Sequence, residues 1–140
     1  MRSLKQSEET YRILYEDNPS MYFAVGDDGR VLSVNRYGAS NLGYQVEELL
    51  GAPVTDVFHP EDREKVTEQL TTCYANPGLV FEWELRKMHQ KGHVMWVREQ
   101  ARAVQDSAGE TIVLIVCEDL TGRREVEEAL RRANDEMEQR

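Results

Sequence analysis

The residue types that most often carry out chemistry are few and scattered in this sequence. The two cysteines, Cys73 and Cys117, lie far apart without CxxC spacing, so we expect reduced thiols rather than a disulfide or a zinc site. His89 and His93 flank a predicted hairpin turn, where solvated side chains are expected, and no metal site is predicted. The sequence has no glycine-rich phosphate loop, GxSxG motif or HExxH motif. It therefore predicts no catalytic residues.

Composition and charge exclude further classes. The 140 residues suit one domain with short appendages. The net charge is −9 and the basic residues are dispersed, which disfavours nucleic acid and direct membrane contact. No apolar run approaches the roughly 20 residues that span a bilayer, and the first residues lack the apolar core of a signal peptide. We therefore expect a cytoplasmic protein, or the cytoplasmic part of a membrane-bound receptor.

The elements that must position any site begin with a predicted helix over residues 3–16. Leu4, Tyr11 and Leu14 share one face of it, and Asn18-Pro19 ends it. Since Leu4 and Tyr11 are seven residues apart, the segment also fits the end of a coiled coil arriving from upstream, and Met1 need not be a natural start. The rest of the chain predicts strands at 21–25 and 31–34, short helices at 36–42 and 46–50, a longer helix at 60–75, and strands at 79–86, 94–104 and 112–117.

The predicted fold class is α+β, with a five-stranded antiparallel sheet. Short turns between successive strands imply antiparallel neighbours, and the block of helices must cover one face. Residues 112–117 are apolar at every position, which predicts a central strand with both faces covered. A central fifth strand pairs with the first and the fourth, so the predicted strand order is 2-1-5-4-3, with flanking helices at both ends.

A charged helix is predicted over residues 123–140, directly after the fifth strand. Its apolar residues follow an a/d spacing over about two heptads, at Val126, Leu130, Ala133 and Met137. Two heptads alone are too short to be stable in water, which favours the start of a longer parallel coiled coil. The alternative is a solvated amphipathic helix that packs back on its own domain. Asp119 and Thr121 are predicted to cap this helix and to form a rigid signal joint between sheet and helix.

Taken in order, these landmarks resemble a PAS domain with its C-terminal PAC segment, of the kind found in bacterial or archaeal sensor histidine kinases. The resemblance covers roughly residues 11–130. It rests on Tyr11-Arg12-Ile13-Leu14, Asn18-Pro19, Asp28-Gly29-Arg30-Val31, Val34-Asn35, Leu42-Gly43-Tyr44, Glu47-Glu48-Leu49-Leu50-Gly51, Phe58-His59-Pro60-Glu61-Asp62-Arg63, Trp96-Val97, Ala101-Arg102-Ala103-Val104, Gly109, Asp119-Leu120-Thr121, Arg123-Arg124 and Glu127.

The resemblance implies an N-terminal flanking helix (1–17), a PAS/PAC core (18–121) and a C-terminal signalling helix (122–140). It also implies a cup between helices and sheet that holds a ligand, a cofactor or only side chains. The signal would leave through the flanking helices of a homodimer, toward an output domain in the same chain. The expected dimer residues are Leu4, Tyr11, Leu14, Val126, Leu130, Ala133 and Met137.

The resemblance allows cofactors to be weighed as well. An adduct-forming flavin is not expected, because residues 52–58, where the family's light sensors carry a reactive cysteine, hold none. Haem is not expected either, because His59, the one histidine near the usual ligand position, belongs to a His59-Pro60-Glu61-Asp62 sequence that recurs in the family at the start of a helix. The identity of any cofactor stays open.

Residues of the cup can be proposed from the same alignment of landmarks. The ligand-pocket candidates are Asn35, Tyr44, Phe58, Val66, Leu70, Phe81, Trp83 and Ile115. Trp83 and Trp96 could serve as ligand platforms, although large aromatics on strands ordinarily fill the core. Asn35, Ser33 and Thr72 are the only plausible buried polar anchors, so a ligand would be small and mostly apolar, or there is none.

These features favour a sensory or relay domain of a larger signal-transduction protein, most simply a two-component sensor histidine kinase. A change in ligand or partner would shift the sheet and alter the C-terminal helix. Two alternatives stay open: a ligand-free PAS scaffold for dimerisation, and the input domain of a cyclic-di-nucleotide signalling enzyme.

Overall fold

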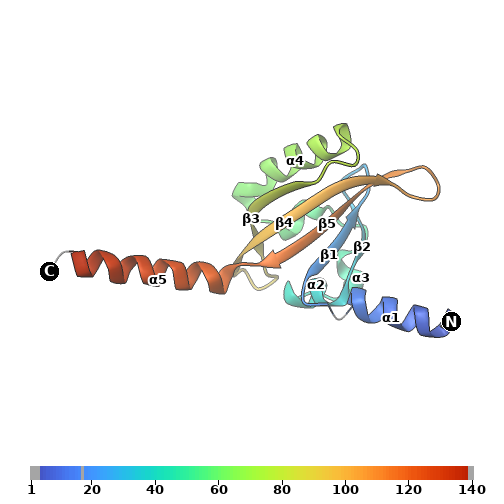
Figure 1. The fold of residues 1–140 in the computed structure, drawn as a ribbon. Coiled ribbons are helices and arrows are strands. Elements are labelled where there is room, and N and C mark those ends of the chain that lie inside the picture. The colour runs from blue at the N-terminus through green and yellow to red at the C-terminus, as the bar shows by residue number, and fades with distance from the viewer. Residues whose placement is uncertain (1–3, 17, 139–140) are drawn as a thin grey trace.

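The computed structural model describes residues 4–16 and 18–138. It contains one five-stranded sheet, several short helices packed on it, and a helix at each end of the chain (Figure 1). The strands are β1 (Met21–Val25), β2 (Val31–Val34), β3 (Phe81–Met88), β4 (Val94–Gln105) and β5 (Thr111–Asp119). The helices are α1 (Leu4–Glu16), α2 (Arg36–Asn41), α3 (Val46–Leu49), α4 (Arg63–Ala75) and α5 (Thr121–Glu138), with single-turn helices η1 (Val54–Val57) and η2 (Pro60–Asp62).

The sheet is antiparallel throughout and has the order β2-β1-β5-β4-β3. The predicted fold class and strand order are therefore confirmed. The tight turn between β1 and β2 uses Gly29 at φ 78, a backbone conformation that residues with a Cβ rarely adopt. Strand β5 is central, because it pairs with β1 on one side and with β4 on the other. The first and the last strand of the chain are therefore neighbours in the sheet.

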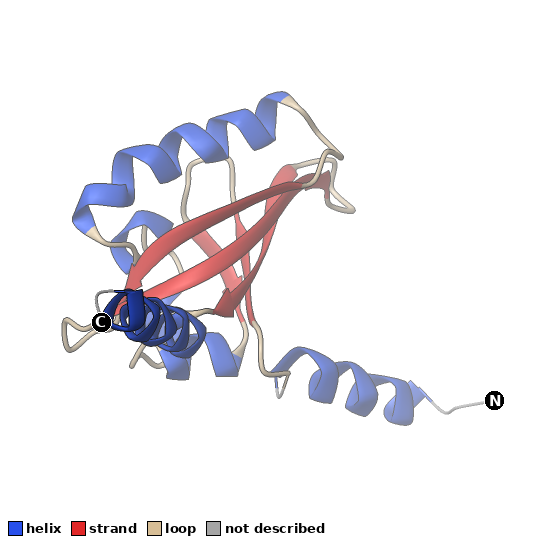
Figure 2. Cartoon of the chain, turned by 60° about the vertical axis from the view of Figure 1, so that its left-hand side comes forward, coloured by secondary structure: helices blue, strands red, loops and turns tan. Residues whose placement is uncertain are grey.

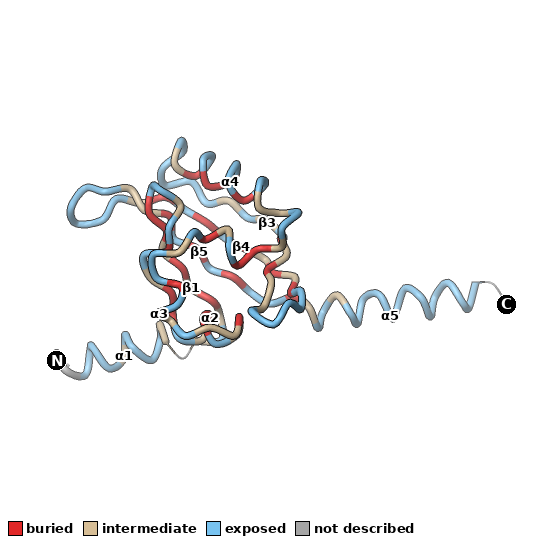
Figure 3. Tube along the Cα trace, turned by 180° about the vertical axis from the view of Figure 1, so that it is seen from behind, coloured by how far each residue is buried: buried red, intermediate tan, exposed pale blue. Residues whose placement is uncertain are grey.

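Helices α2, α3 and α4 cover one face of the sheet, which we call the inner face (Figure 2). Successive residues of a strand point to opposite faces, so alternate residues of every strand enter the core. The buried apolar core residues include Met21, Phe23, Val25, Leu85, Val97, Val113 and Ile115 from the strands, and Val66, Leu70 and Cys73 from α4. Burial is concentrated between the sheet and these helices, as the colouring of Figure 3 shows.

The other face, which we call the outer face, is open to solvent along β5. Leu114 and Val116 are 37% and 36% exposed, although β5 is central. The prediction that both faces of this strand are covered was wrong. A central place in the hydrogen-bonded order does not require a second layer of helices, so this apolar outer surface is available to another partner.

The terminal helices project away from the body of the domain in different directions (Figure 1). Helix α1 keeps few contacts with the sheet, and α5 contacts mainly the first residues of β4, around Trp96. No helix among residues 4–16 and 18–138 has the length and apolar character needed to cross a membrane.

Candidate functional site

The inner face carries a lysine that is fully enclosed by protein. Lys87 is 0% exposed and comes from β3, beside Phe58, which bridges to it. Its Nζ lies 3.9 Å from the ring centre of Phe23 and 4.9 Å from that of Phe58, so aromatic faces stabilise the ammonium. No side chain or backbone group of the described residues meets the distance and angle limits of a hydrogen bond to the Nζ. A buried ammonium with three free donors is costly, which marks this position as a candidate site.

A glutamate lies on the same face of the sheet, two inward-facing residue pairs away from Lys87 along the β3–β4 pairing. Glu99 of β4 is 2% exposed and is paired in register with Trp83 of β3 and Cys117 of β5. Its Oε2 accepts a hydrogen bond from the Cys117 thiol at 3.9 Å. Burial raises the pKa of Glu99, and the charge of Lys87 offsets only part of that rise. No ion pair of the described residues joins Glu99 to Lys87 directly.

The remaining members of this polar interior come from α4 and β5. Gln69 is 8% exposed, and its Oε1 has no hydrogen-bond partner within residues 4–16 and 18–138. Burial raises the pKa of Cys73 to about 11 and that of Cys117 to about 12. Thiols that hold their protons so firmly are weak nucleophiles, so both cysteines act here as packed, unreactive groups. We call Lys87, Glu99 and Gln69 the interior cluster.

Most of the predicted pocket residues do face the core. Phe58, Val66, Leu70 and Ile115 are buried, while Tyr44, Phe81 and Trp83 are partly buried and pack against the same cluster of side chains. Phe81 and Trp83 stack with ring centres 5.5 Å apart. Among the predicted residues, Phe58 places the centre of its ring 4.9 Å from the Lys87 Nζ. Ligand contact by the predicted residues stays a prediction.

Asn35 is fully buried, and its side chain has a structural task. Its Oδ1 accepts hydrogen bonds from the backbone N–H groups of Tyr22 and Gly38, each at 3.0 Å. Its Nδ2 donates to the carbonyls of Tyr15 and Ser20 at 2.7 and 2.9 Å. The amide therefore caps α2 and ties the end of α1 to β1.

The expectation that Asn35, Ser33 and Thr72 are the only buried polar anchors was wrong. Thr72 is exposed and donates to the carbonyl of Glu68, and Ser33 is partly buried and accepts from the Tyr15 hydroxyl. The residues that sequence reasoning missed are Lys87, Glu99 and Gln69. The signal was present for the first two, because Lys87 has the same strand parity as Leu85, and Glu99 that of Val97 and Ala101.

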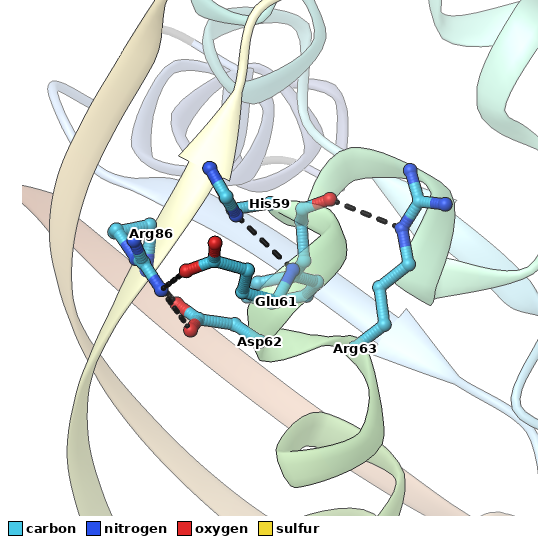
Figure 4. Close-up of polar contacts among 6 residues, drawn as sticks. His59, Glu61, Asp62, Arg63 and Arg86 are labelled. Atoms are coloured by element: carbon cyan, nitrogen blue, oxygen red, sulfur yellow. Dashed lines mark hydrogen bonds and ion pairs between the residues drawn. The ribbon is translucent and has the colours of Figure 1, made fainter.

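The start of α4 is fastened to β3 by a group of ion pairs at the rim (Figure 4). Arg86 donates from Nη2 to Asp62 Oδ1 at 2.7 Å, and from its backbone N–H and Nε to Asp62 Oδ2 at 2.9 and 3.2 Å. Glu61 adds a longer ion pair at 3.3 Å. The Arg86 guanidinium beside Asp62 holds the pKa of that carboxyl below its ordinary value. His59 Nδ1 accepts from the Glu61 backbone N–H at 3.1 Å, so His59 caps η2.

The other two histidines stack on each other across the β3–β4 hairpin, with ring centres 4.1 Å apart. Partial burial and the neighbouring His93 lower the pKa of His89. Within residues 4–16 and 18–138, no group of three or more His, Cys, Asp and Glu side chains could hold a metal ion.

The joint between β5 and α5 is short and well anchored. Only Leu120 separates the two elements; it is buried, and its backbone N–H donates to the Trp96 carbonyl at 2.7 Å. Asp119 Oδ1 accepts from the Thr121 N–H at 2.9 Å, which caps the helix as predicted. Thr121 does not cap the helix, and that part of the prediction was wrong. Its Oγ1 accepts from the Trp96 N–H at 3.1 Å and so fastens α5 to β4.

Trp96 links the joint to the rim on the outer face. The guanidinium of Arg124, in the first turns of α5, lies 3.9 Å from the centre of the Trp96 ring and also forms an ion pair with Glu84 of β3. On the same ring, the guanidinium carbon of Arg86 lies 5.6 Å from the centre. One aromatic ring thus contacts both the residue that holds the start of α4 and the residue that holds the start of α5.

The predicted dimer residues lie mostly in the open. Tyr11 and Leu14 of α1 are 69% and 61% exposed. The stripe on α5 is equally exposed, at Val126, Leu130, Ala133 and Met137. The side chain of Leu4 lies outside the described residues. No residue of α5 is buried, so the alternative in which this helix packs back on its own domain does not describe the structure.

Comparison with known proteins identifies the family. The sequence model described as the PAS fold matches residues 31–117, which is more than half of the chain. The chain belongs to the PAS family. The five-stranded order and the covering helices described above are the fold of this family.

Several curated proteins contain a region similar to this PAS domain. The aryl hydrocarbon receptor nuclear translocator homolog of Drosophila melanogaster is 30% identical over 96 residues, 69% of this chain and 15% of that protein. A probable diguanylate cyclase of Escherichia coli is 25% identical over 114 residues, 81% of this chain and 10% of that protein. The peroxide stress-activated histidine kinase of Schizosaccharomyces pombe is 26% identical over 143 residues, 96% of this chain and 9% of that protein. The chain thus spans a small fraction of these relatives.

Solved structures show the same fold. The PAS domain of an HTR-like protein from Haloarcula marismortui superposes with a TM-score of 0.74 at 24% identity, over 83% of this chain and 93% of that one. At this identity the likeness concerns the fold alone, so the chemistry of the interior has to be argued from this chain's own residues.

Proposed function

We propose that this PAS domain is a cytoplasmic sensory or relay module of a two-component sensor histidine kinase. A change in the core would reach the output through β5 and α5. The observation that carries the proposal is the joint, where Leu120 alone separates a central strand from an exposed helix. One hydrogen bond, from Thr121 to Asp119, joins the strand to the helix, and three contacts with Trp96 fasten the joint to β4. A joint of this kind transmits a movement of the sheet, because no loop is present to absorb it.

The relatives support this setting. A histidine kinase aligns over nearly the whole chain, including the flanking helices, and this chain covers less than a tenth of that protein's length. A PAS domain without catalytic residues of its own fits the role of an input to a separate output domain. The kinase is therefore a proposal for the parent protein, in which this domain would act as an input and the chemistry would lie elsewhere in the chain.

The exposed stripes support a homodimer. Val126, Leu130 and Met137 repeat along α5 with coiled-coil spacing and are each at least 60% exposed. The outer face adds Leu114 and Val116, which lie on β5, the strand that enters the joint. Apolar side chains placed this way gain stability by packing against a second copy, and a parallel pair would bring two output domains together.

The first test is the oligomeric state of the purified chain by light scattering and native mass spectrometry. We expect a dimer in the wild type and a shift to monomer in Leu130→Glu, because a carboxylate in the seam of a coiled coil is poorly tolerated. Arg132→Glu, a change on the same helix outside the stripe, should leave the dimer intact. A wild-type chain that stays monomeric at high concentration would rule out the dimeric relay.

The second test addresses signalling in the full-length protein. Thr121→Val removes the acceptor for the Trp96 N–H while keeping the shape of the side chain. We expect autophosphorylation to persist but to lose its response to the stimulus. Thr71→Val, an exposed threonine on α4 remote from the joint, serves as the control. An unchanged response in Thr121→Val would show that the signal does not pass through this joint.

A second candidate is the input domain of a cyclic-di-nucleotide signalling enzyme, which the similarity to a probable diguanylate cyclase favours. The relay through β5 and α5 would be the same and only the output would differ. A ligand-free scaffold is the outcome left if the dimer forms but Thr121→Val changes nothing.

A further inference from the structure

The two edge strands of the sheet, β2 and β3, differ in how their free sides are covered. An edge strand carries a row of backbone N–H and C=O groups that no neighbouring strand pairs. At β2, the segment after α3 fills this row, because the Val31 N–H donates to the Ala52 carbonyl and the Val31 carbonyl accepts from the Gly51 N–H, each at 2.9 Å. Next to β2, the Val54 N–H donates to the Gly29 carbonyl at 2.9 Å. This edge of the sheet is therefore closed.

Strand β3 forms the other edge (Figure 1), and it is covered at one end only. The Arg86 N–H donates to Asp62 Oδ2 at 2.9 Å, and the Arg86 carbonyl accepts from the His59 N–H at 2.9 Å. These backbone groups therefore point away from β4, and in an antiparallel pair the same holds for every second residue. Glu82 and Glu84 thus also direct their N–H and C=O groups away from β4. Within the part of the chain that the structure describes, no hydrogen bond reaches these four groups.

Aromatic rings border this open stretch on the inner face. Phe81 and Trp83 alternate with the two glutamates and are only partly buried. Their rings stack with centres 5.5 Å apart and planes 1° from parallel. Leu79 and Val80, which precede the strand, are 56% and 61% exposed. An added strand would place its inward-facing side chains over these groups, so large apolar residues are favoured at alternate positions of the partner.

Carboxylates border the same stretch on the outer face. Glu82 and Glu84 form ion pairs with Arg98 and Arg124, but their side chains remain 54% and 47% exposed. A carboxylate accepts several hydrogen bonds, so each has capacity for a second basic group that arrives along the edge. Two copies of this chain paired edge to edge would instead place glutamates against glutamates, which is destabilising. Together with the net charge of −9, this arrangement favours a basic strand over a second copy.

We propose that the open edge of β3 binds an extended segment of a partner protein in which basic residues alternate with large apolar ones. The segment would lie beside β3 as an additional strand, with hydrogen bonds to the backbone of Glu82 and Glu84. Its basic side chains would reach the two carboxylates, and its apolar side chains would cover the stacked aromatic pair. The pairing would end at Arg86, whose outward groups are already bonded, so the site takes a short segment. This partner surface is independent of the proposed relay through α5.

The test uses two synthetic heptapeptides with blocked ends, one that alternates lysine with valine and one that alternates glutamate with valine. The purified 140-residue chain is titrated with each peptide, and binding is followed by NMR of the backbone amides. Because a short peptide loses much entropy when it is ordered, we expect a dissociation constant of about 0.1 to 1 mM for the lysine peptide. The glutamate peptide should not bind. In the bound state, amide hydrogen exchange should slow at Glu82 and Glu84.

A proline substitution tests the backbone contact. Glu82→Pro removes one outward N–H and leaves the hydrogen bonds between β3 and β4 in place, because edge strands accept proline where the N–H faces solvent. Since proline also removes the carboxylate, Glu82→Gln is its matched control. We expect both variants to weaken the lysine peptide, and Glu82→Pro to bind it about fivefold more weakly than Glu82→Gln, which is the effect of one hydrogen bond.

An exchange of charge tests the side chains without relying on proline. Glu82→Lys/Glu84→Lys should bind the glutamate peptide and should weaken the lysine peptide at least about tenfold. Glu64→Lys/Glu68→Lys, at exposed positions of α4, changes the net charge by the same amount and should keep the preference of the wild type. This comparison decides between a specific edge and general attraction even if Glu82→Pro does not fold.

Three results would overturn the proposed edge site. The first is no binding of the lysine peptide at millimolar concentration, or equal binding to the wild type and to the charge-exchanged edge. The second is slowed exchange at Leu114 and Val116 instead of at the edge, which would place the peptide on the outer face. The third is slowed exchange at Glu82 and Glu84 as the protein concentration rises without peptide, which would show that a second copy occupies the edge.

Discussion

Arg86 and Lys87 are neighbours on β3, but acidic side chains surround the first and mainly apolar side chains surround the second. Arg86 points to the outer rim and is matched by Asp62, Glu61 and the Trp96 ring. Lys87 points into the core, where its Nζ lies against two aromatic rings and has no hydrogen bond to any residue that the structure describes. Successive side chains of a strand point to opposite faces of the sheet. This alone places Arg86 at the rim, where it forms ion pairs, and Lys87 in the core, where it is a candidate binding group. The ion-paired Arg86 at the rim therefore stabilises the fold, whereas Lys87 in the interior has no ion pair among the described residues and is a candidate binding group.

The largest effect should come from the interior. Glu99→Leu removes the buried carboxyl that interacts electrostatically with Lys87 and accepts from the Cys117 thiol, and we expect a loss of about 3 kcal/mol or more in the free energy of unfolding, measured with urea. The double variant Lys87→Met/Glu99→Leu should recover most of that loss, since no buried charge is left. A Glu99→Leu protein as stable as the wild type would show that Lys87 does not rely on Glu99.

The corresponding change at the rim should lower the free energy of unfolding by a smaller amount. Asp62→Asn removes the charge that faces Arg86 while keeping a similar shape, and we expect a loss of about 1 kcal/mol because the pair is partly solvated. The same urea measurement on Asp56→Asn, an exposed aspartate on η1, should show almost no change. If Asp62→Asn lost more than Glu99→Leu, the contrast between rim and interior would be reversed.

The two carboxyls should also give stability profiles of opposite sign with pH. The hydrogen-bonded Arg86 lowers the pKa of Asp62 from 3.8, so its contribution is present above that pH and is lost on acidification. Burial raises the pKa of Glu99 from 4.5, so its contribution is present below that pH and is lost as the pH rises through the folded-state value. In Asp62→Asn, we expect the free energy of unfolding to fall less on acidification than in the wild type. In Glu99→Gln, we expect it to fall less as the pH rises. Each difference should be about 1 kcal/mol or less. Matching limbs in wild type and variants would contradict these assignments.

Much of the fold could be predicted because hydrophobic periodicity and turn residues mark each strand in the sequence. Alternating strands, turn residues such as Gly29 and the apolar run of β5 determine the strand order without any knowledge of side-chain contacts. The same apolar run led to the wrong expectation for its outer face. An apolar residue at the surface and one in the core look alike in a sequence, since the difference lies in what covers them.

The site was harder to predict, for a physical reason. Apolar residues are expected inside, so Phe58, Val66 and Ile115 could be named from pattern alone. Lys87 and Glu99 break that rule, and composition places charged residues on the surface. Strand parity does point both of them inward, but how each is paired depends on distances between β3, β4 and α4 that no local pattern contains. Thr121 is a similar case, because its partner on Trp96 is 25 residues away.

The junction at Leu120 has a mechanical consequence. An α-helix rises 1.5 Å per residue, so the 18 residues of α5 form a lever about 27 Å long. A tilt of about 10° at its base therefore displaces the far end by about 5 Å, close to one helical turn. A small rearrangement at the base of α5 is thus amplified to about the length of one helical turn at the far end of this helix.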